Sequence, residues 1–355
     1  MSDIIEQWRE AIRAATTARR PLQLRGGGTK DFYGRPPSGE VFDTRYHRGI
    51  VSYEPTELVV TVRAGTPLAE LEAALAEKNQ WLAFEPPHFG EGATVGGTVA
   101  CGLSGPRRLA AGALRDFVLG MKVMDGRGDV LSFGGQVMKN VAGFDASRLM
   151  AGSLGTLGLI LEVSLKVLPR PVQEATLRLE CDEATALANM NEWGAQPLPV
   201  SATAWHDGVL HVRLSGARAA VEAAQKRLGG TRVDDDEAAR FWTDLREQRH
   251  AFFTAGDAPL WRFALPTTTP PLALDGAKLI EWGGGQRWLR SDADPSALRA
   301  VATALGGHAT LFRGGDRSGD VFQRPAAALM DIHRRLKAGF DPAGIFNPGR
   351  LYQEF

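Results

Sequence analysis

The sequence predicts an α+β fold with two domains, the second built on an antiparallel sheet covered by helices. Its 355 residues exceed a typical domain of roughly 150. Alternating and helical hydrophobic periods recur along the chain, as expected for strands interspersed with helices. The Pro169-Arg170-Pro171 segment disfavours both helix and sheet, so we place the domain boundary there.

Composition excludes several classes of protein. The chain is 44% hydrophobic and 23% charged, and its 41 Lys+Arg balance 41 Asp+Glu. Zero net charge argues against nucleic acid or an anionic membrane as the main partner. No stretch approaches the roughly 18 apolar residues of a membrane-spanning helix. Cys101 and Cys181 are too few for a disulfide framework, an iron-sulfur cluster or a structural zinc site, so we expect a cytoplasmic protein without a metal.

Residues 1–172 are expected to form the first domain, beginning with a helix. Helical spacing of apolar residues from Ile5 to Ala15 predicts this helix, and Pro21 ends it. A second helix is expected with Thr66 as N-cap and Pro67 at its first position. The expected strands cover residues 22–24, 57–63, 117–124, 130–133 and 159–167.

Residues 174–330 are expected to form the second domain, and residues 331–355 a tail that returns to the first. The tail is rich in proline and glycine and needs a surface or a cofactor to hold it. A helix from about 325 to 338 leads into it. The expected strands of the second domain cover 175–180, 200–205, a partner after the turn at 206–208, 260–265, 279–282, 287–290 and 308–312. The expected helices cover 183–193, 217–228 and 295–305.

Glycine is the compositional outlier, with 41 residues, sixteen of them between Gly90 and Gly158. Glycine has no Cβ, so the backbone can turn sharply or approach a ligand closely. The Gly26-Gly27-Gly28-Thr29-Lys30 segment can direct several backbone N–H groups at one anion such as a diphosphate. Its spacing matches neither the Walker nor the Rossmann pattern, and a plain turn is the alternative.

The order of several segments resembles the vanillyl-alcohol-oxidase-type, or PCMH-type, FAD-binding family. The segments are the triple-glycine loop, Ala64–Pro67, Thr94–Gly97, Arg115–Gly120 and Gly152–Ile160. Within that family the chain resembles the FAD-binding E subunits of bacterial glycolate oxidases. The segments that carry this second resemblance are Tyr46–Val51, Glu85–His88, Ser104–Arg108, Val137–Gly143 and Asp341–Leu351.

The resemblance implies an FAD site with particular residues. FAD is expected to be noncovalent, because the diphosphate loop lacks the histidine that commonly attaches it in relatives. The loop residues Gly26, Gly27, Gly28, Thr29 and Lys30 would receive the diphosphate through backbone N–H groups. The remaining implied contacts are Thr94, Gly96, Gly97 and Gly102 in extended form along the flavin, Gly155, Thr156, Gly158 and Ile160 through backbone groups, and Asn347 near the isoalloxazine.

The resemblance also implies an activity and partners. The chain would serve a complex that oxidises glycolate, a small 2-hydroxy acid, to glyoxylate. Electrons would pass through a second FAD-binding subunit and an iron-sulfur subunit. Any association of the complex with the inner membrane would be peripheral and would be made through these partners. Two alternatives stay open: a self-sufficient FAD dehydrogenase for another small hydroxy acid, and a structural subunit that keeps the fold without redox function.

Substrate chemistry is harder to assign. Related hydroxy-acid dehydrogenases carry a His-rich metal and substrate site, and the seven histidines here show no matching pattern. His88 is the candidate titrating catalytic group, with a structural loop histidine as the alternative. His308 is either a remnant of the His-rich site or an ordinary sheet residue, and His206 and His211 are expected on a hairpin surface. The base and the carboxylate-binding cations therefore stay unassigned.

Overall fold

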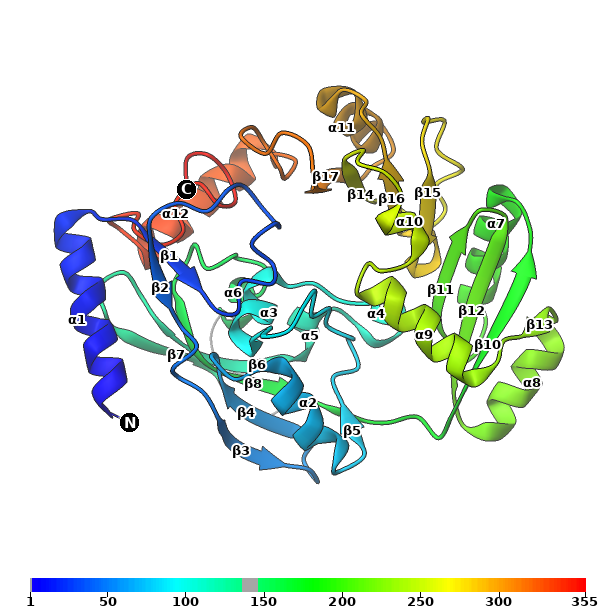
Figure 1. Ribbon diagram of the computed structural model, residues 1–355, viewed down its shortest axis with the longest axis horizontal. Helices are drawn as coiled ribbons and strands as arrows, with labels where there is room; N and C mark the ends of the chain where they lie inside the picture. Colours follow the sequence, from blue (N-terminus) through cyan, green and yellow to red (C-terminus); the bar gives the residue numbers. More distant parts are fainter. Residues whose placement is uncertain (1, 136–145) are drawn as a thin grey trace.

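The computed structural model describes residues 2–135 and 146–355, which build two sheets that lie on opposite sides of the molecule (Figure 1). The Val137–Gly143 segment of the resemblance lies outside the described residues. No helix within the described part of the chain combines the length and the apolar character needed to span a bilayer.

The first domain is built on a five-stranded antiparallel sheet in the order β3-β4-β8-β6-β7, with the small parallel pair β1-β2 and the antiparallel pair β5-β9 beside it. Its strands are β1 (Leu22–Arg25), β2 (Glu40–Asp43), β3 (Ile50–Glu54), β4 (Val59–Arg63), β5 (Gln80–Trp81), β6 (Val118–Met124), β7 (Val130–Gly134), β8 (Leu159–Lys166) and β9 (Leu168–Pro169). Its helices are α1 (Ser2–Ala18), α2 (Leu68–Ala76), α3 (Val95–Cys101), α4 (Arg108–Ala111), α5 (Leu114–Phe117) and α6 (Ser147–Met150).

The central strands of this sheet are buried, which explains their Val- and Leu-rich composition. Leu68, Leu71 and Leu75 of α2 pack with them into one core. The expected N-cap of α2 is wrong. Pro67 occupies the cap position and makes no side-chain hydrogen bond there. The Thr66 hydroxyl does not cap the helix; it accepts the Gly49 N–H, at 2.8 Å.

The second domain is built on an eight-stranded sheet in the order β13-β10-β12-β11-β15-β16-β14-β17, in which every pair of neighbours is antiparallel. Its strands are β10 (Gln173–Glu180), β11 (Val200–His206), β12 (Val209–Gly216), β13 (Thr231–Arg232), β14 (Leu260–Ala264), β15 (Lys278–Glu281), β16 (Gln286–Arg290) and β17 (His308–Arg313). Its helices are α7 (Glu183–Gly194), α8 (Arg218–Leu228), α9 (Asp235–Arg246), α10 (Ala251–Thr254), the 3₁₀ turn η1 (Trp282–Gly284) and α11 (Pro295–Ala304). The predicted α+β class and the antiparallel sheet are confirmed.

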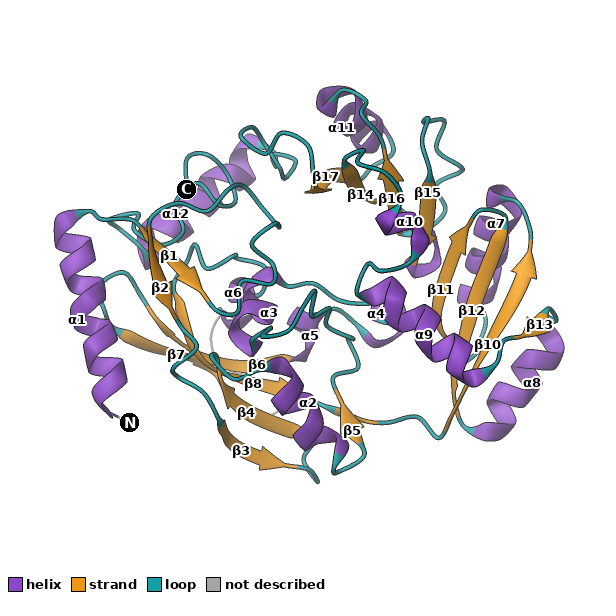
Figure 2. Ribbon diagram, in the orientation of Figure 1, coloured by secondary structure: helices purple, strands orange, loops and turns teal. Residues whose placement is uncertain are grey.

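The two faces of the large sheet have different roles. Helices α7, α8 and α11 cover one face and complete two apolar cores. The other face turns toward the first domain, and helix α9 lies between this face and the first domain (Figure 2). There Trp288 and Phe312 of the sheet pack in one cluster with Tyr33, Leu103 and Leu154 of the first domain. Any ligand held between the two domains meets this second face.

The C-terminal segment returns to the first domain. Helix α12 (Ala327–Phe340) precedes it, and Figure 1 shows this red segment beside β1, drawn in blue. Phe346 forms a parallel bridge with Leu22. The buried Lys337 ammonium donates to the carbonyls of Thr156 and Phe346, at 2.7 and 2.9 Å, and pairs with Asp341. These contacts fix the tail against the glycine-rich loops.

Candidate functional site

Two adjoining cavities collect the glycine clusters into one cleft. The first, of about 570 Å³ including its open mouth, lies over the loop after β1. The second, of about 370 Å³, shares Gly26, Gly97 and Asn347 with the first and continues toward β8. Between them the cavities are lined by twelve of the fourteen predicted cofactor residues: Gly26, Gly27, Gly28, Thr29, Lys30, Thr94, Gly96, Gly97, Gly155, Gly158, Ile160 and Asn347.

Two predicted cofactor residues do not line the cleft. Gly102 ends helix α3 in a left-handed conformation, φ 64°, and a Cβ there would lie 2.9 Å from the Gly152 backbone. Thr156 is fully buried, and its hydroxyl donates to the Ser153 carbonyl at 2.8 Å. Both residues shape the chain that surrounds the cleft.

The loop at the cleft presents a row of unused donors. Among the described residues, none accepts a hydrogen bond from the backbone N–H groups of Gly27, Gly28, Thr29 and Lys30. Backbone donors that line a cavity without a protein acceptor need another acceptor. Successive N–H groups of this kind form an anion-binding concavity. The loop therefore fits the diphosphate of FAD, which offers acceptor oxygens and negative charge.

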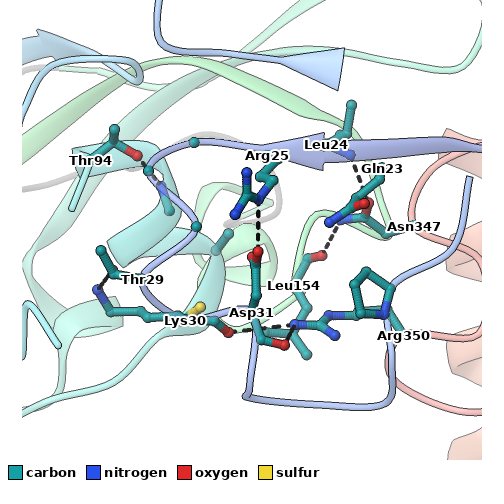
Figure 3. A pocket seen from close by; sticks show the side chains of 17 residues that line it. Gln23, Leu24, Arg25, Thr29, Lys30, Asp31, Thr94, Leu154, Asn347 and Arg350 are labelled. Carbon is teal, nitrogen blue, oxygen red and sulfur yellow. Dashed lines mark hydrogen bonds and ion pairs between the residues drawn. The ribbon is translucent and has the colours of Figure 1, made fainter. Parts of the chain in front are cut away.

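Side chains around the loop hold it in shape (Figure 3). Arg25 pairs with Asp31 across the turn, with 2.7 Å between nitrogen and oxygen. Gly28 takes φ 72°, and a Cβ there would lie 2.2 Å from the Arg25 guanidinium. From the C-terminal tail, the buried Arg350 donates to the Asp31 carbonyl at 2.9 Å. These contacts orient the loop, and they leave its N–H groups free to point at a ligand.

Asn347 braces the cleft. Its side-chain carbonyl accepts the Leu24 N–H at 2.8 Å, and its amide donates to the Leu154 carbonyl at 2.6 Å (Figure 3). It therefore ties β1 to the Gly152–Ile160 segment. Gly155 is glycine for the same reason, since a Cβ there would lie 2.7 Å from the Asn347 amide nitrogen.

Of the residues expected to be extended, Thr94 is extended, with φ −109° and ψ 155°, but Gly96 and Gly97 lie in helix α3 and Gly102 is left-handed, which corrects the expectation for these three glycines. The Thr94 hydroxyl accepts the Gly97 N–H and caps α3. Gly96 lets this helix pack against the first sheet, because a Cβ there would lie 2.7 Å from Ala64 Cβ. Small side chains are thus required for close helix packing as well as for an open cleft.

Charge and burial act on two side chains that line the cleft. Burial lowers the pKa of Lys30, whose ammonium donates to the His88 carbonyl at 3.2 Å. Burial raises the pKa of the Cys101 thiol, which the positive charges of Lys30 and Arg350 partly offset. Cys101 is accordingly a neutral thiol near neutral pH, and the net charge of the cleft is positive.

The structure does not bring the His88 ring into the cleft. Its Nε2 lies 2.9 Å from a Glu72 oxygen, and its backbone N–H donates to Glu247 at 3.0 Å. His88 reaches the cleft only through its carbonyl, which Lys30 contacts. The ring is therefore placed for structural contacts outside the cleft.

Three further histidines, His206, His211 and His308, lie in strands of the large sheet. His206 and His211 occupy the predicted β11–β12 hairpin. His211 stacks on Phe241 with ring centroids 4.0 Å apart, and burial lowers its pKa to about 4. His308 begins β17 opposite Ala264. The described residues contain no group of three or more His, Cys, Asp or Glu side chains arranged to hold a metal ion.

Sequence reasoning missed Arg25, Asp31 and Arg350 as parts of the site. The first two flank the triple glycine, and their opposite charges on either side of a turn were a usable signal. Arg350 lies only three residues after Asn347, but its role depends on how the tail returns, which no local pattern reveals.

Comparison with known proteins agrees with this geometry. Residues 4–134 match a family model described as FAD binding domain. Glycolate oxidase subunit GlcE of Escherichia coli is 49% identical over 345 residues, covering 97% of this chain and 96% of that protein. Glycolate oxidase subunit GlcD of Bacillus subtilis is 33% identical over 45% of this chain and 34% of that protein. A solved structure of alkyldihydroxyacetonephosphate synthase superposes with a TM-score of 0.66 at 15% identity, covering 97% of this chain and 75% of that one.

Fold, cleft and family match together define the class: the chain is a flavoprotein with a PCMH-type FAD-binding domain. The near-complete coverage of one relative defines it more narrowly. The chain belongs to the family of glycolate oxidase subunit GlcE.

Proposed function

We propose that this chain is the FAD-binding subunit of a glycolate oxidase, a complex that oxidises glycolate to glyoxylate and passes electrons to partner redox subunits. The family membership supports this proposal. The observation that carries it in the structure is the row of backbone N–H groups from Gly27 to Lys30, which line the cleft and find no acceptor among residues 2–135 and 146–355.

In this proposal each group of residues at the cleft binds or accommodates a different part of FAD. The loop of Gly26, Gly27, Gly28, Thr29 and Lys30 binds the diphosphate through N–H groups. The small side chains of Thr94, Gly96 and Gly97 leave room for the body of the cofactor. Gly155, Gly158, Ile160 and Asn347 line its other side, while Gly102 and Thr156 act by shaping the surrounding backbone. Bound noncovalently, FAD supplies the two-electron acceptor for oxidation of the hydroxy acid.

We further propose partners of two kinds, a second FAD-binding subunit and an iron-sulfur subunit. The two cysteines of this chain are too few to hold an iron-sulfur cluster, so another chain must supply it. The proposed location is cytoplasmic, with contact to the inner membrane made through these partners.

An anaerobic reduction experiment tests the proposal. The purified chain is loaded with FAD, assembled with its partners and mixed with glycolate while the visible spectrum is recorded. Bleaching of the oxidised flavin absorption is expected with glycolate and not with succinate, which lacks a hydroxyl group. A folded chain that neither binds FAD nor associates with a second flavoprotein would contradict the proposal. Bleaching of the isolated chain would favour a self-sufficient dehydrogenase.

A further inference from the structure

A separate pocket between the domains holds a buried carboxyl group and a guanidinium that are not paired with each other. It has a volume of about 340 Å³ including its opening and lies between the first-domain segment 87–106 and the large sheet. The residues that line it include one carboxyl group, that of Glu281, and the guanidinium of Arg262, and several of the others are apolar. This pocket adjoins the cofactor cleft: Phe89 lines the pocket, and its ring centroid lies 5.9 Å from the Lys30 ammonium in the cleft.

Sheet register places these groups on one face. Arg262 of β14 pairs with Trp288 of β16, and Gln286 of the same strand pairs with Glu281 of β15. Directly paired residues, and residues two apart on one strand, share a face. All four side chains therefore project from the face of the sheet that turns toward the first domain.

Glu281 is a buried carboxyl that forms no ion pair with any described residue. It is only 4% exposed, and one of its oxygens accepts the Trp288 indole N–H at 2.6 Å and the Gln286 amide at 3.0 Å. Burial, together with the nearby negative charge of Glu85, raises the pKa of Glu281 to about 7, although the two hydrogen bonds act to lower this pKa. Such a carboxyl can accept and release a proton near neutral pH.

Arg262 supplies a cation at the same pocket. Its guanidinium donates to the Tyr33 hydroxyl at 3.0 Å, and within the described part of the chain no carboxylate lies within ion-pair distance of it. Arg108 lies close enough that the positive charge of Arg262, added to burial, lowers the pKa of Arg108. A guanidinium that pairs with no described carboxylate favours a bound anion.

On these observations, and resting on the function proposed above, we propose that this pocket binds the 2-hydroxy acid, with Arg262 pairing with its carboxylate and Glu281 as the catalytic base for its hydroxyl group. Glu281 and Arg262 line the same pocket without pairing with each other, so both groups stay available to a small molecule that carries a carboxylate and a hydroxyl group. Phe89, Leu103 and Trp288 contribute apolar walls to this pocket.

The proposed step balances in atoms and electrons. The O–H bond breaks and its proton goes to the Glu281 carboxylate. The C–H bond on the same carbon breaks and a C=O bond forms; oxidised FAD, held by the loop residues of the cofactor cleft, would supply the two-electron acceptor for the departing hydride. The groups facing Glu281 are Glu85, Gln286 and Trp288, while Arg246 and Arg262 line the same pocket. Only the deprotonated Glu281 can take the proton, so the rate should fall as the pH drops through about 7.

The test uses the FAD-loaded chain in its assembled complex, with two measurements. Binding of oxalate, a two-carbon carboxylate that cannot be oxidised by hydride loss, is measured by calorimetry. Flavin reduction by glycolate is followed by stopped-flow absorbance between pH 5.5 and 9. Glu281→Gln should slow reduction by about 10²- to 10⁴-fold and flatten the pH profile. It should change oxalate affinity less than threefold. Arg262→Gln should weaken oxalate binding by about 10- to 100-fold.

Matched controls and a second variant keep the outcomes distinct. Glu162→Gln removes a partly buried carboxyl on β8, and Arg178→Gln removes an exposed guanidinium on β10; both should behave as wild type. If Glu281→Gln loses FAD or melts early, Glu281→Asp keeps the carboxyl and should retain the pH dependence at a reduced rate.

The outcomes separate this inference from the proposed function. A Glu281→Gln variant with the wild-type rate and pH profile, or an Arg262→Gln variant with wild-type oxalate affinity, would overturn the inference while the complex still oxidises glycolate. A wild-type complex that neither binds oxalate nor is reduced by glycolate would remove the proposed function, and this inference with it.

Discussion

Gly97 offers a sharp test of the cofactor cleft. It lies in α3 and lines both cavities. Apart from its own helix, the nearest described heavy atom to a Cβ at this position is the Thr94 hydroxyl oxygen, at 3.1 Å. Valine is a slightly better helix former than glycine, by about 0.3 kcal/mol. A weakened Thr94 cap costs about 1 kcal/mol. Gly97→Val should therefore change the free energy of unfolding by no more than about 1 kcal/mol.

The effect on FAD should be much larger. The two added methyl groups occupy space in the cleft, so the cofactor must move away from the loop donors. Losing two hydrogen bonds to a charged group costs about 3 kcal/mol or more, which is at least a 100-fold rise in Kd. The assay is titration of the apoprotein with FAD, followed by quenching of flavin fluorescence, with circular dichroism as a check on folding.

Gly194→Val is the matched control, since Gly194 ends helix α7 in the second domain and a Cβ there would meet no atom within 4 Å. It should bind FAD as wild type does. Gly27→Val is a poor test, because a Cβ at Gly27 would lie 1.7 Å from the Gly92 carbonyl oxygen and would displace the backbone itself. A folded Gly97→Val protein with a Kd within threefold of wild type would refute our placement of the cofactor.

Three further predictions concern residues around the cleft and between the domains. Asn347→Ala should lower the free energy of unfolding by about 1–3 kcal/mol in urea titrations and weaken FAD binding, because two buried backbone groups lose their partner. Burial would raise the pKa of Glu85, but Arg213 and Arg107 outweigh it and hold this pKa below the usual 4.5. The resulting stabilisation is complete above that value and is lost as the pH falls through the folded pKa. Glu85→Gln should therefore destabilise the protein by about 3–5 kcal/mol at pH 7 and flatten the acid limb of a melting-temperature profile. His88→Ala should leave the Kd for FAD within threefold of wild type, because its ring contacts Glu72 outside the cleft; a large loss of FAD would restore His88 to the site.

Hydrophobic periodicity predicted helices and strands well where the pattern within one segment is enough to determine its secondary structure. The expected strand 159–167 is β8 (Leu159–Lys166), and the expected helix 183–193 is α7 (Glu183–Gly194). Helix α9 was missed although its signals were present. Asp234 caps it, and Ala238, Trp242 and Leu245 form its buried stripe. Its charged first turn hid an amphipathic pattern that a helical-period count would have found.

Features that depend on tertiary contacts could not be predicted from the sequence. The small residues from Thr94 to Gly102 are compatible with extended chain or with helix, and packing against Ala64 decides for helix. The glycine clusters were found through the resemblance and do meet in one cleft. Glu281 and Arg262 are single charged residues in separate strands, and only the order and register of the strands shows that they share a face.

The position of Asn347 has a consequence for biosynthesis. Leu24, in the strand that leads into the triple-glycine loop, is translated 323 residues before Asn347, yet its N–H group needs the Asn347 side chain as acceptor. A nascent chain still on the ribosome therefore holds an unbraced loop. Binding of the cofactor should therefore follow the emergence of the Asn347 segment from the ribosome.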